Sequence, residues 1–198
     1  MVQERRRRRE EGQAVTAVAI VVVLVLVAAA LGIVFRTGKV SSEVSKIQSG
    51  ADAAALAGAQ QVREDAYDNI VRSLQSRVPR GFWSCGDGQG RAQSFASRNS
   101  TDVTTYCYYP LADRVEVSVR SDFVTETGRR ESADAVAQTG RRLGPCIVVA
   151  VPGSTTGYET TADCGDVTVR VYVDTTGNVT LLTTVAEVKK MFRVTLRE

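Results

Sequence analysis

The sequence predicts an α+β protein in which an N-terminal transmembrane helix continues into a long amphipathic helix, followed by a small disulfide-stapled domain with an antiparallel sheet. Three observations support this. A run of uncharged, almost wholly apolar residues lies near the N-terminus, and apolar residues then recur at helical spacing over residues 39–74. Beyond residue 78, β-branched residues alternate with polar ones, and all four cysteines lie there.

These patterns divide the chain into four expected parts. They are a cytoplasmic basic segment (1–12), a transmembrane helix (13–36), an amphipathic stalk helix (37–77) and an extracytoplasmic α+β domain (78–198).

The apolar run Ala14–Phe35 is long enough to cross a membrane. At about 1.5 Å per residue its 22 residues reach roughly 33 Å, against about 30 Å for the hydrocarbon core. Arg5–Arg9 precede it, and only three basic residues follow over a similar distance. Because positive flanks stay in the cytoplasm, we expect a single-pass cell-membrane protein with a cytoplasmic N-terminus and an extracytoplasmic C-terminal domain, in contact with membrane lipid.

A cleaved secretory signal is the alternative to this anchor. Residues 14–27 would be its apolar core, and Ala28–Ala30 fit a cleavage site of small residues. The apolar run continues through Leu31–Phe35, which favours an uncleaved span.

Composition excludes several functions. The formal charge is +3, and five arginines minus three glutamates in residues 1–12 supply +2 of it. The remainder is nearly neutral, which argues against a nucleic-acid surface. Histidine is absent, so His-based catalysis and His-containing metal sites are excluded.

The cysteines form no C-x-x-C pair, and in an exported segment an even number of them predicts disulfides. Three pairings are possible. The short loops favour Cys85–Cys107 and Cys146–Cys164, over four reduced thiols.

The stalk carries one narrow apolar stripe with coiled-coil spacing. Its members follow one another at intervals of four, three, four, three and four residues: Val40, Val44, Ile47, Ala51, Ala54 and Gly58. Small residues at Gly50, Ala51, Ala54 and Gly58 predict a helix-packing face that another backbone can approach closely. This face could pack on the protein's own sheet, on another subunit, or on both.

The segment Gln48–Ala59 has the sequence QSGADAAALAGA and follows a basic N-terminus, a glycine and one apolar span. This arrangement resembles the TadE/TadG-like proteins of the Flp (Tad) pilus assembly system, and the resemblance extends as far as Ala59. It implies a bacterial envelope protein, pseudopilin-like or minor pilin-like. Such proteins pack their N-terminal helix against other pilus or pilus-assembly subunits.

The resemblance also implies a possible prepilin-type cleavage between Gly12 and Gln13. Processed members carry a glutamate at the fifth position after the glycine, whereas this chain has Ala17 there. This departure fits better the TadG-type members, which stay anchored in the membrane.

The outer domain is expected to begin after the turn signals of residues 78–81 and to alternate helices with strands. We expect helices over 91–98 and 132–143, and a final helix or strand over 187–196. Strands are expected over 103–109, 114–120, 146–151, 167–173 and 179–184. A polar loop is expected over 154–161 and a turn at 174–178. In this scheme Tyr106, Tyr108 and Tyr109 pack in a strand with their hydroxyls reaching water.

The sequence carries no catalytic constellation, so we expect a non-enzymatic protein without cofactor, metal site or small-molecule substrate. Asp163, Asp166 and Asp174 do not have the spacing of a Ca²⁺ loop. The first hypothesis is therefore a membrane-anchored structural component of Tad/Flp pilus assembly or a related secretion system. The alternative is a membrane-anchored extracytoplasmic domain that binds a ligand or senses one.

Overall fold

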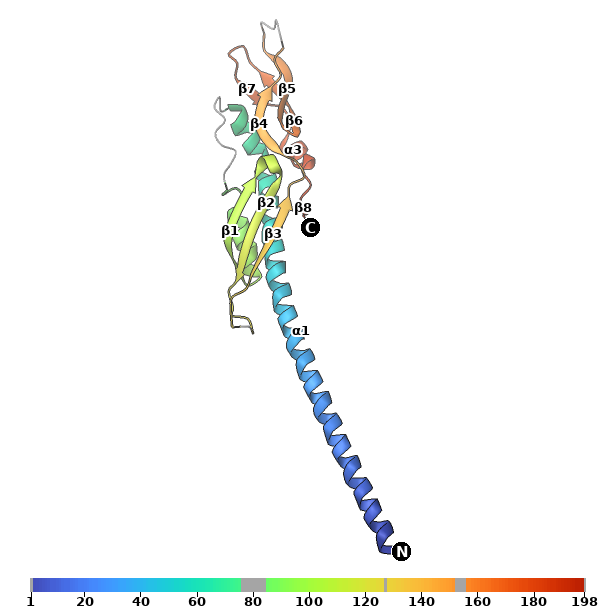
Figure 1. Cartoon of the computed structure of the whole chain (residues 1–198). Coiled ribbons are helices and arrows are strands. Elements are labelled where there is room, and N and C mark those ends of the chain that lie inside the picture. The colour runs from blue at the N-terminus through green and yellow to red at the C-terminus, as the bar shows by residue number, and fades with distance from the viewer. Residues whose placement is uncertain (1, 76–84, 127, 152–155, 198) are drawn as a thin grey trace. The chain divides into compact units, whose positions relative to one another are not determined.

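The computed structural model describes residues 2–75, 85–126, 128–151 and 156–197 (Figure 1). The chain forms two compact units, Met1–Val44 and Ser45–Glu198. The domain boundary expected near residue 78 lies outside the described residues, so the four-part division stays a prediction.

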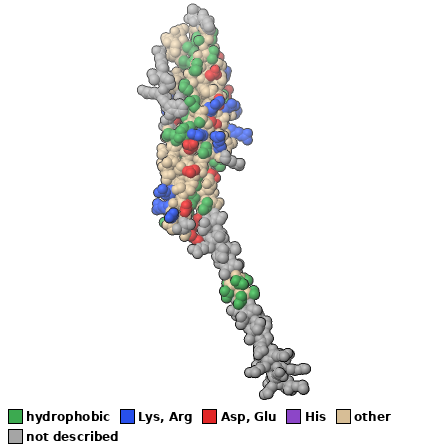
Figure 2. All heavy atoms as spheres, viewed as in Figure 1, with side chains coloured by type: hydrophobic (Ala, Val, Ile, Leu, Met, Phe, Trp, Pro, Cys, Tyr) green, Lys and Arg blue, Asp and Glu red, His purple; other side chains and the backbone are tan. Residues whose placement is uncertain are grey.

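The helix α1 covers Val2–Gln75 and contributes to both units. In the first unit the described aliphatic side chains from Val22 to Val27 are each 50–64% exposed, and Figure 2 shows them as an apolar patch. Among the helices in the described part of the chain, none combines the length and the apolar character that a membrane crossing requires.

The C-terminal unit contains two four-stranded antiparallel sheets, which confirms the α+β class but divides the expected sheet in two. Sheet A has the strand order β1-β2-β3-β8, and sheet B has the order β4-β5-β6-β7. The strands of sheet A are β1 (Thr101–Tyr109), β2 (Arg114–Ser121), β3 (Ser132–Gln138) and β8 (Thr195–Leu196). Those of sheet B are β4 (Leu143–Val148), β5 (Tyr158–Gly165), β6 (Val167–Val173) and β7 (Val179–Leu181).

The described part of this unit also contains three short helices: α2 (Gln89–Arg98), the 3-10 helix η1 (Pro110–Ala112) and α3 (Val185–Met191). The helix expected over 91–98 is α2, with Ala92 and Ala96 buried. The final segment contains both expected alternatives, because α3 is followed by β8. Thr184 and Glu187 form a capping box that starts α3, a signal present in the sequence as Thr-x-x-Glu.

Each sheet has its own core, and α1 contributes to both. Ile47, Ala51 and Ala54 of α1 pack with the valines of β2 and the alanines of β3 under sheet A. Further along the helix, Ala66 and Ile70 pack with the valines of β6 under sheet B. The apolar stripe of the sequence is therefore buried from Ile47 onward, whereas Val44 is 54% exposed.

The helix expected over 132–143 is wrong, because residues 132–138 form β3. Alanines at 133, 135 and 137 alternate with polar residues and Val136, so the segment has strand periodicity despite the high helix propensity of alanine. Val115 pairs with Ala137 and Val119 with Ala133, which places these small side chains under α1.

The polar loop expected over 154–161 is also wrong for its second half, because β5 begins at Tyr158. The inward side chains of β5 include Thr160 and Ala162, so the sequence lacks the alternation of apolar and polar residues that would predict a strand here. In contrast, the strand expected over 167–173 is confirmed as β6, in which the four valines are buried and the residues between them are exposed.

Candidate functional site: the small-residue face of the long helix

The small-residue face of α1, formed by Gly50, Ala51, Ala54 and Gly58, lies against the protein's own secondary structure. Ala51 and Ala54 are fully buried in the core under sheet A. Of the packing possibilities that the sequence leaves open, the structure shows this face against the protein's own sheet within the C-terminal unit.

Gly58 allows β1 to approach the helix closely in this contact. A Cβ atom placed on Gly58 would lie 2.8 Å from both Cε2 and the hydroxyl oxygen of Tyr106 on β1. Real Cβ atoms do not approach heavy atoms so closely, so a larger residue would displace the tyrosine ring or the helix. The glycine is thus required by packing, although its backbone is ordinary α-helix.

Tyr106 closes the contact from the strand side. Its ring is 9% exposed, and its hydroxyl donates a 2.6 Å hydrogen bond to the backbone carbonyl of Asp87. Burial is the main cause that raises the pKa of the Tyr106 hydroxyl, so it remains a neutral donor at any physiological pH. The expectation that this hydroxyl reaches water is wrong, because the ring lies against Gly58 and its hydroxyl bonds the loop before α2.

The loop between Cys85 and α2 supplies the third side. Gly88 precedes α2 as its N-cap residue with φ +87°, a left-handed conformation that favours glycine. A Cβ atom on Gly88 would lie 2.5 Å from the carbonyl oxygen of Gly58. Within the glycine-rich stretch 86–90, Gly88 therefore serves close packing on α1.

Gly50 makes an equivalent contact at the N-terminal end of the small-residue face. A Cβ atom there would lie 2.6 Å from Oγ1 of Thr101, the first residue of β1. Thr101 is 1% exposed, and its hydroxyl donates a 3.0 Å hydrogen bond to the carbonyl of Ala96 in α2. A single threonine thus joins the helix face, the strand and α2.

A polar contact borders this packing. Arg91 of α2 forms an ion pair with Glu64 of α1, with Nη1 2.8 Å from Oε2, and the same nitrogen donates to Oε1 of Gln61 at 3.2 Å. Both charged side chains are partly exposed, so the pair orients α2 more than it stabilises the fold.

The two disulfides have the pairing that short loops favour. Cys85 and Cys107 connect the loop before α2 to β1, with their Cα atoms 4.0 Å apart. Cys146 and Cys164 face each other across β4 and β5, with their Cα atoms 4.1 Å apart. Each disulfide therefore fixes one of the two sheets locally.

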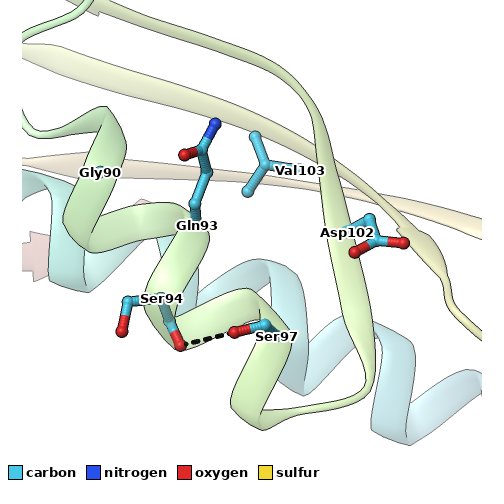
Figure 3. Close-up of a pocket in the computed structure, with 6 residues that line it drawn as sticks. All are labelled: Gly90, Gln93, Ser94, Ser97, Asp102 and Val103. Atoms are coloured by element: carbon cyan, nitrogen blue, oxygen red, sulfur yellow. Dashed lines mark hydrogen bonds between the residues drawn. The ribbon is translucent and has the colours of Figure 1, made fainter.

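A small groove lies on the outer side of α2, with a volume of about 460 Å³. It is lined by Gly90, Gln93, Ser94 and Ser97 of α2 and by Asp102 and Val103 of β1. Figure 3 shows Gln93 and Val103 turned toward each other across the groove, whereas Ser97 donates its hydroxyl to the carbonyl of Ser94. Most of its lining is polar, and Val103 is its one branched apolar side chain.

The remaining sequence candidates do not join this face. Gly12 and Gln13 belong to the part of α1 in the first unit. Asp166 pairs with Arg142 and Asp174 closes a turn. Within the described residues, no group of three or more His, Cys, Asp or Glu side chains is arranged to hold a metal ion.

Three features of this contact were not predicted from the sequence: the place of Thr101, the close approach of Gly88 to α1, and the contact of Tyr106 with Gly58. Only Gly88 left a signal, because a cluster of glycines before a helix indicates positive φ or close approach. The other two depend on which strand lies under α1, which is a tertiary property.

The part of the chain that contains this face also contains the apolar run and Gly12. Residues 12–61 match the family model of putative Flp pilus-assembly TadE/G-like proteins. The TadE/G-like match begins at the glycine of the predicted cleavage site and ends just beyond the small-residue face, so the resemblance seen in the sequence is confirmed over this segment. Neither the curated proteins nor the solved structures give a match for the chain.

Proposed function

We propose that this protein is a membrane-anchored structural component of Tad/Flp pilus assembly or of a related secretion system, without enzymatic activity. The observation that carries the proposal is the TadE/G-like match over residues 12–61, a segment that contains the apolar run and the small-residue face. The C-terminal unit then provides an exported, disulfide-stapled domain on the far side of the membrane.

The anchor is proposed from the sequence. Residues 14–35 carry no charge and follow five arginines, a pattern that favours a single span with a cytoplasmic N-terminus. The exposed aliphatic side chains of Val22–Val27 agree with this, because the described chain leaves them without an apolar cover. Lipid or another apolar helix would supply it.

The position of the partner contacts follows from the packing described above. From Ile47 to Val62 the inward face of α1 is buried under sheet A, so it is not available to another subunit. We therefore assign contacts with other pilus or pilus-assembly subunits through this helix to its segment before Ile47. This narrows the partner surface to the apolar run and the residues that follow it.

A ligand-binding or sensory domain is the second candidate, and the groove beside α2 is the observation that favours it. Its volume of about 460 Å³ falls within the usual range of ligand pockets. Such pockets are mainly apolar or aromatic, whereas this groove is mainly polar and includes no aromatic residue, so we rank the candidate second. The test is to find a compound that the unaltered protein binds and to measure whether the Gln93→Ala variant loses that binding.

The first experiment is to shear pili from cells and determine where the protein is found, with the mature N-terminus identified by mass spectrometry. Full-length protein in the membrane fraction is the result we expect for an anchored assembly factor. A chain beginning at Gln13 in the sheared filaments would make it a minor pilin despite Ala17. A chain beginning at Leu31 would overturn the anchor, because the apolar run would then be a cleaved signal.

A further inference from the structure

Positive charge is concentrated around the C-terminal end of α3. Residues 188–197 contain four basic residues, Lys189, Lys190, Arg193 and Arg197, and no acidic residue. The C-terminal unit as a whole has 18 Lys and Arg residues and 18 Asp and Glu residues, so its charge is balanced overall but uneven locally. Figure 2 shows Lys and Arg side chains grouped on the side of the unit where Figure 1 places α3.

Two arginines from other elements join this end of the helix. Nε of Arg63 on α1 donates to the carbonyl of Lys189 at 3.0 Å, and Nε of Arg141, after β3, donates to the carbonyl of Met191 at 3.3 Å. The last carbonyls of a helix lack partners within it and attract positive charge, so these two contacts serve the fold. Each bond uses Nε and leaves the Nη groups of the guanidinium for another acceptor.

The side chains of Lys190 and Arg193 have no such role. Both are exposed, and neither side chain forms a hydrogen bond or an ion pair with the residues that the structure describes. Arg193 is held by its backbone, because its N–H donates to the carbonyl of Thr139 at 2.8 Å and Gly140 lies against its main chain. The position of this charge is therefore fixed although its side chain is free.

Two acidic side chains border these cations, and both have partners. Asp166 forms an ion pair with Arg142, with Oδ2 2.9 Å from Nε. Glu187, one helical turn before Lys190, accepts hydrogen bonds from the N–H and the hydroxyl of Thr184. Like charges that gather without counter-charges repel one another. Since Arg63 and Arg141 already serve the carbonyls of α3, the further cations add repulsion, which indicates an anionic partner outside the chain.

We propose that the cationic cluster formed by Arg63, Arg141, Lys189, Lys190 and Arg193 binds an acidic protein segment of another pilus-assembly subunit. This inference rests on the proposed function, which places other such subunits beside this chain. The cluster is then a second contact surface, in addition to the part of α1 before Ile47. Asp and Glu side chains are its ligands, because the planar guanidinium of arginine binds a carboxylate through two parallel hydrogen bonds.

The exposure of the cluster favours a partner with several carboxylates. Arg141, Lys190 and Arg193 are exposed, and an exposed ion pair contributes little by itself. A single small carboxylate would therefore bind weakly. Several carboxylates on one chain bind together, because the first contact raises the effective concentration of the next.

The apolar residues between these cations are not available to a membrane surface. Val188, Met191 and Phe192 pack in the core under sheet B. Basic surfaces that lie on anionic lipid add exposed apolar side chains, which enter the headgroup region. The burial of these three side chains therefore favours a protein segment over a lipid surface as the partner.

Binding of a fluorescently labelled deca-glutamate peptide to the full chain in a non-ionic detergent tests the proposal by fluorescence anisotropy. We expect binding that weakens as salt is added, because exposed charges are screened. The double variant Lys190→Gln with Arg193→Gln should lower the affinity about tenfold, because it removes two of the five charges. Absence of binding by the unaltered chain at low salt would overturn the proposal.

Arg129→Gln with Arg130→Gln is the matched control, because it removes the same charge from exposed residues between β2 and β3. This variant should bind the peptide as the unaltered chain does, and Arg5–Arg9 contribute equally to both double variants. An equal loss of affinity in the two variants would show non-specific attraction and refute the cluster as a site. Urea denaturation of the same samples should give one midpoint for all three chains.

Competition distinguishes the possible anionic partners. Unlabelled peptide, alginate (a carboxylate polysaccharide) and phosphatidylglycerol vesicles each compete with the labelled peptide, and we expect the unlabelled peptide to do so at the lowest concentration of anionic groups. Stronger competition by alginate or vesicles would refute a protein segment as the partner. Cell fractionation tests the anchor separately: a membrane-bound chain without cluster-dependent binding refutes only this inference, whereas a chain outside the membrane refutes the anchor and leaves the binding result standing.

Discussion

Under sheet A the long helix presents Gly50, Ala51, Ala54 and Gly58, whereas under sheet B it presents Ala66 and Ile70 together with half-buried Leu74. Under sheet A, the absence of side chains allows a tyrosine and a threonine of β1 to lie directly on the helix backbone. Under sheet B, aliphatic side chains fill the space between helix and strands. One helix therefore uses close approach at one sheet and apolar burial at the other.

Because of this difference, the two regions should respond differently to substitutions that change side-chain volume. Close approach fails when a side chain is added, and apolar burial fails when one is removed. The two sheets should therefore differ in the kind of substitution that each one tolerates.

The largest effect is expected from Gly58→Leu under sheet A. The new side chain would collide with Tyr106, whose hydroxyl is held by its hydrogen bond to the carbonyl of Asp87. We expect a loss above about 3 kcal/mol in the free energy of unfolding, measured by urea denaturation of the detergent-solubilised chain.

Gly90→Leu is the matched control, because a Cβ atom on this helical glycine of α2 has nothing within 4 Å. Equal stability of the two variants would contradict the close-approach account of the small-residue face. A pilus defect in Gly58→Leu would then also need another cause than misfolding of the C-terminal unit.

The second effect is expected from Ile70→Ala under sheet B. Ile70 is fully buried, and truncation leaves a cavity against the valines of β6. We expect a loss of roughly 2–4 kcal/mol in the same denaturation experiment. Val71→Ala, at the half-buried neighbouring position outside this core, should cost clearly less; a similar cost would argue against packing of Ile70 under sheet B.

The same contrast explains which parts of the fold the sequence predicts. The valines of β6 alternate with polar residues, so burial of large side chains is visible as a period of two. The alanines of β3 have that period too, but their helix propensity masks it. β5 has no apolar alternation and exists as a strand through its pairing with β4 and β6.

The candidate site divides in the same way. Gly50 and Gly58 are recognisable as a helix face because they recur with Ala54 at four-residue spacing. What covers them is not recognisable, because Tyr106 and Thr101 reach the helix through the register of β1 with β2. Local spacing thus predicts a packing face, and long-range strand pairing determines its occupant.

A third, smaller effect is expected from Thr101→Val, which keeps the shape of the side chain facing Gly50. The variant removes the hydrogen bond from the hydroxyl to Ala96 without opening a cavity. The carbonyl of Ala96 still accepts from the N–H of Asn99, so no buried acceptor is left unpaired. We expect a loss of about 1 kcal/mol, whereas Thr105→Val at an exposed position of the same strand should change little.

The smallest effect concerns the turn that precedes β7 in sheet B. Asp174 accepts hydrogen bonds from the N–H and hydroxyl of Thr176 and from the N–H and side-chain amide of Asn178. These bonds, the Thr176 hydroxyl first, lower the pKa of Asp174 from 3.8 to about 2. Since the folded pKa is below the unfolded one, the stabilisation is complete above pH 3.8 and is lost as the pH falls toward 2.

The thermal unfolding midpoint of the wild type should therefore exceed that of Asp174→Asn at pH 6, and the difference should shrink on acidification to pH 2. A difference that is independent of pH would show that shape rather than charge holds this turn.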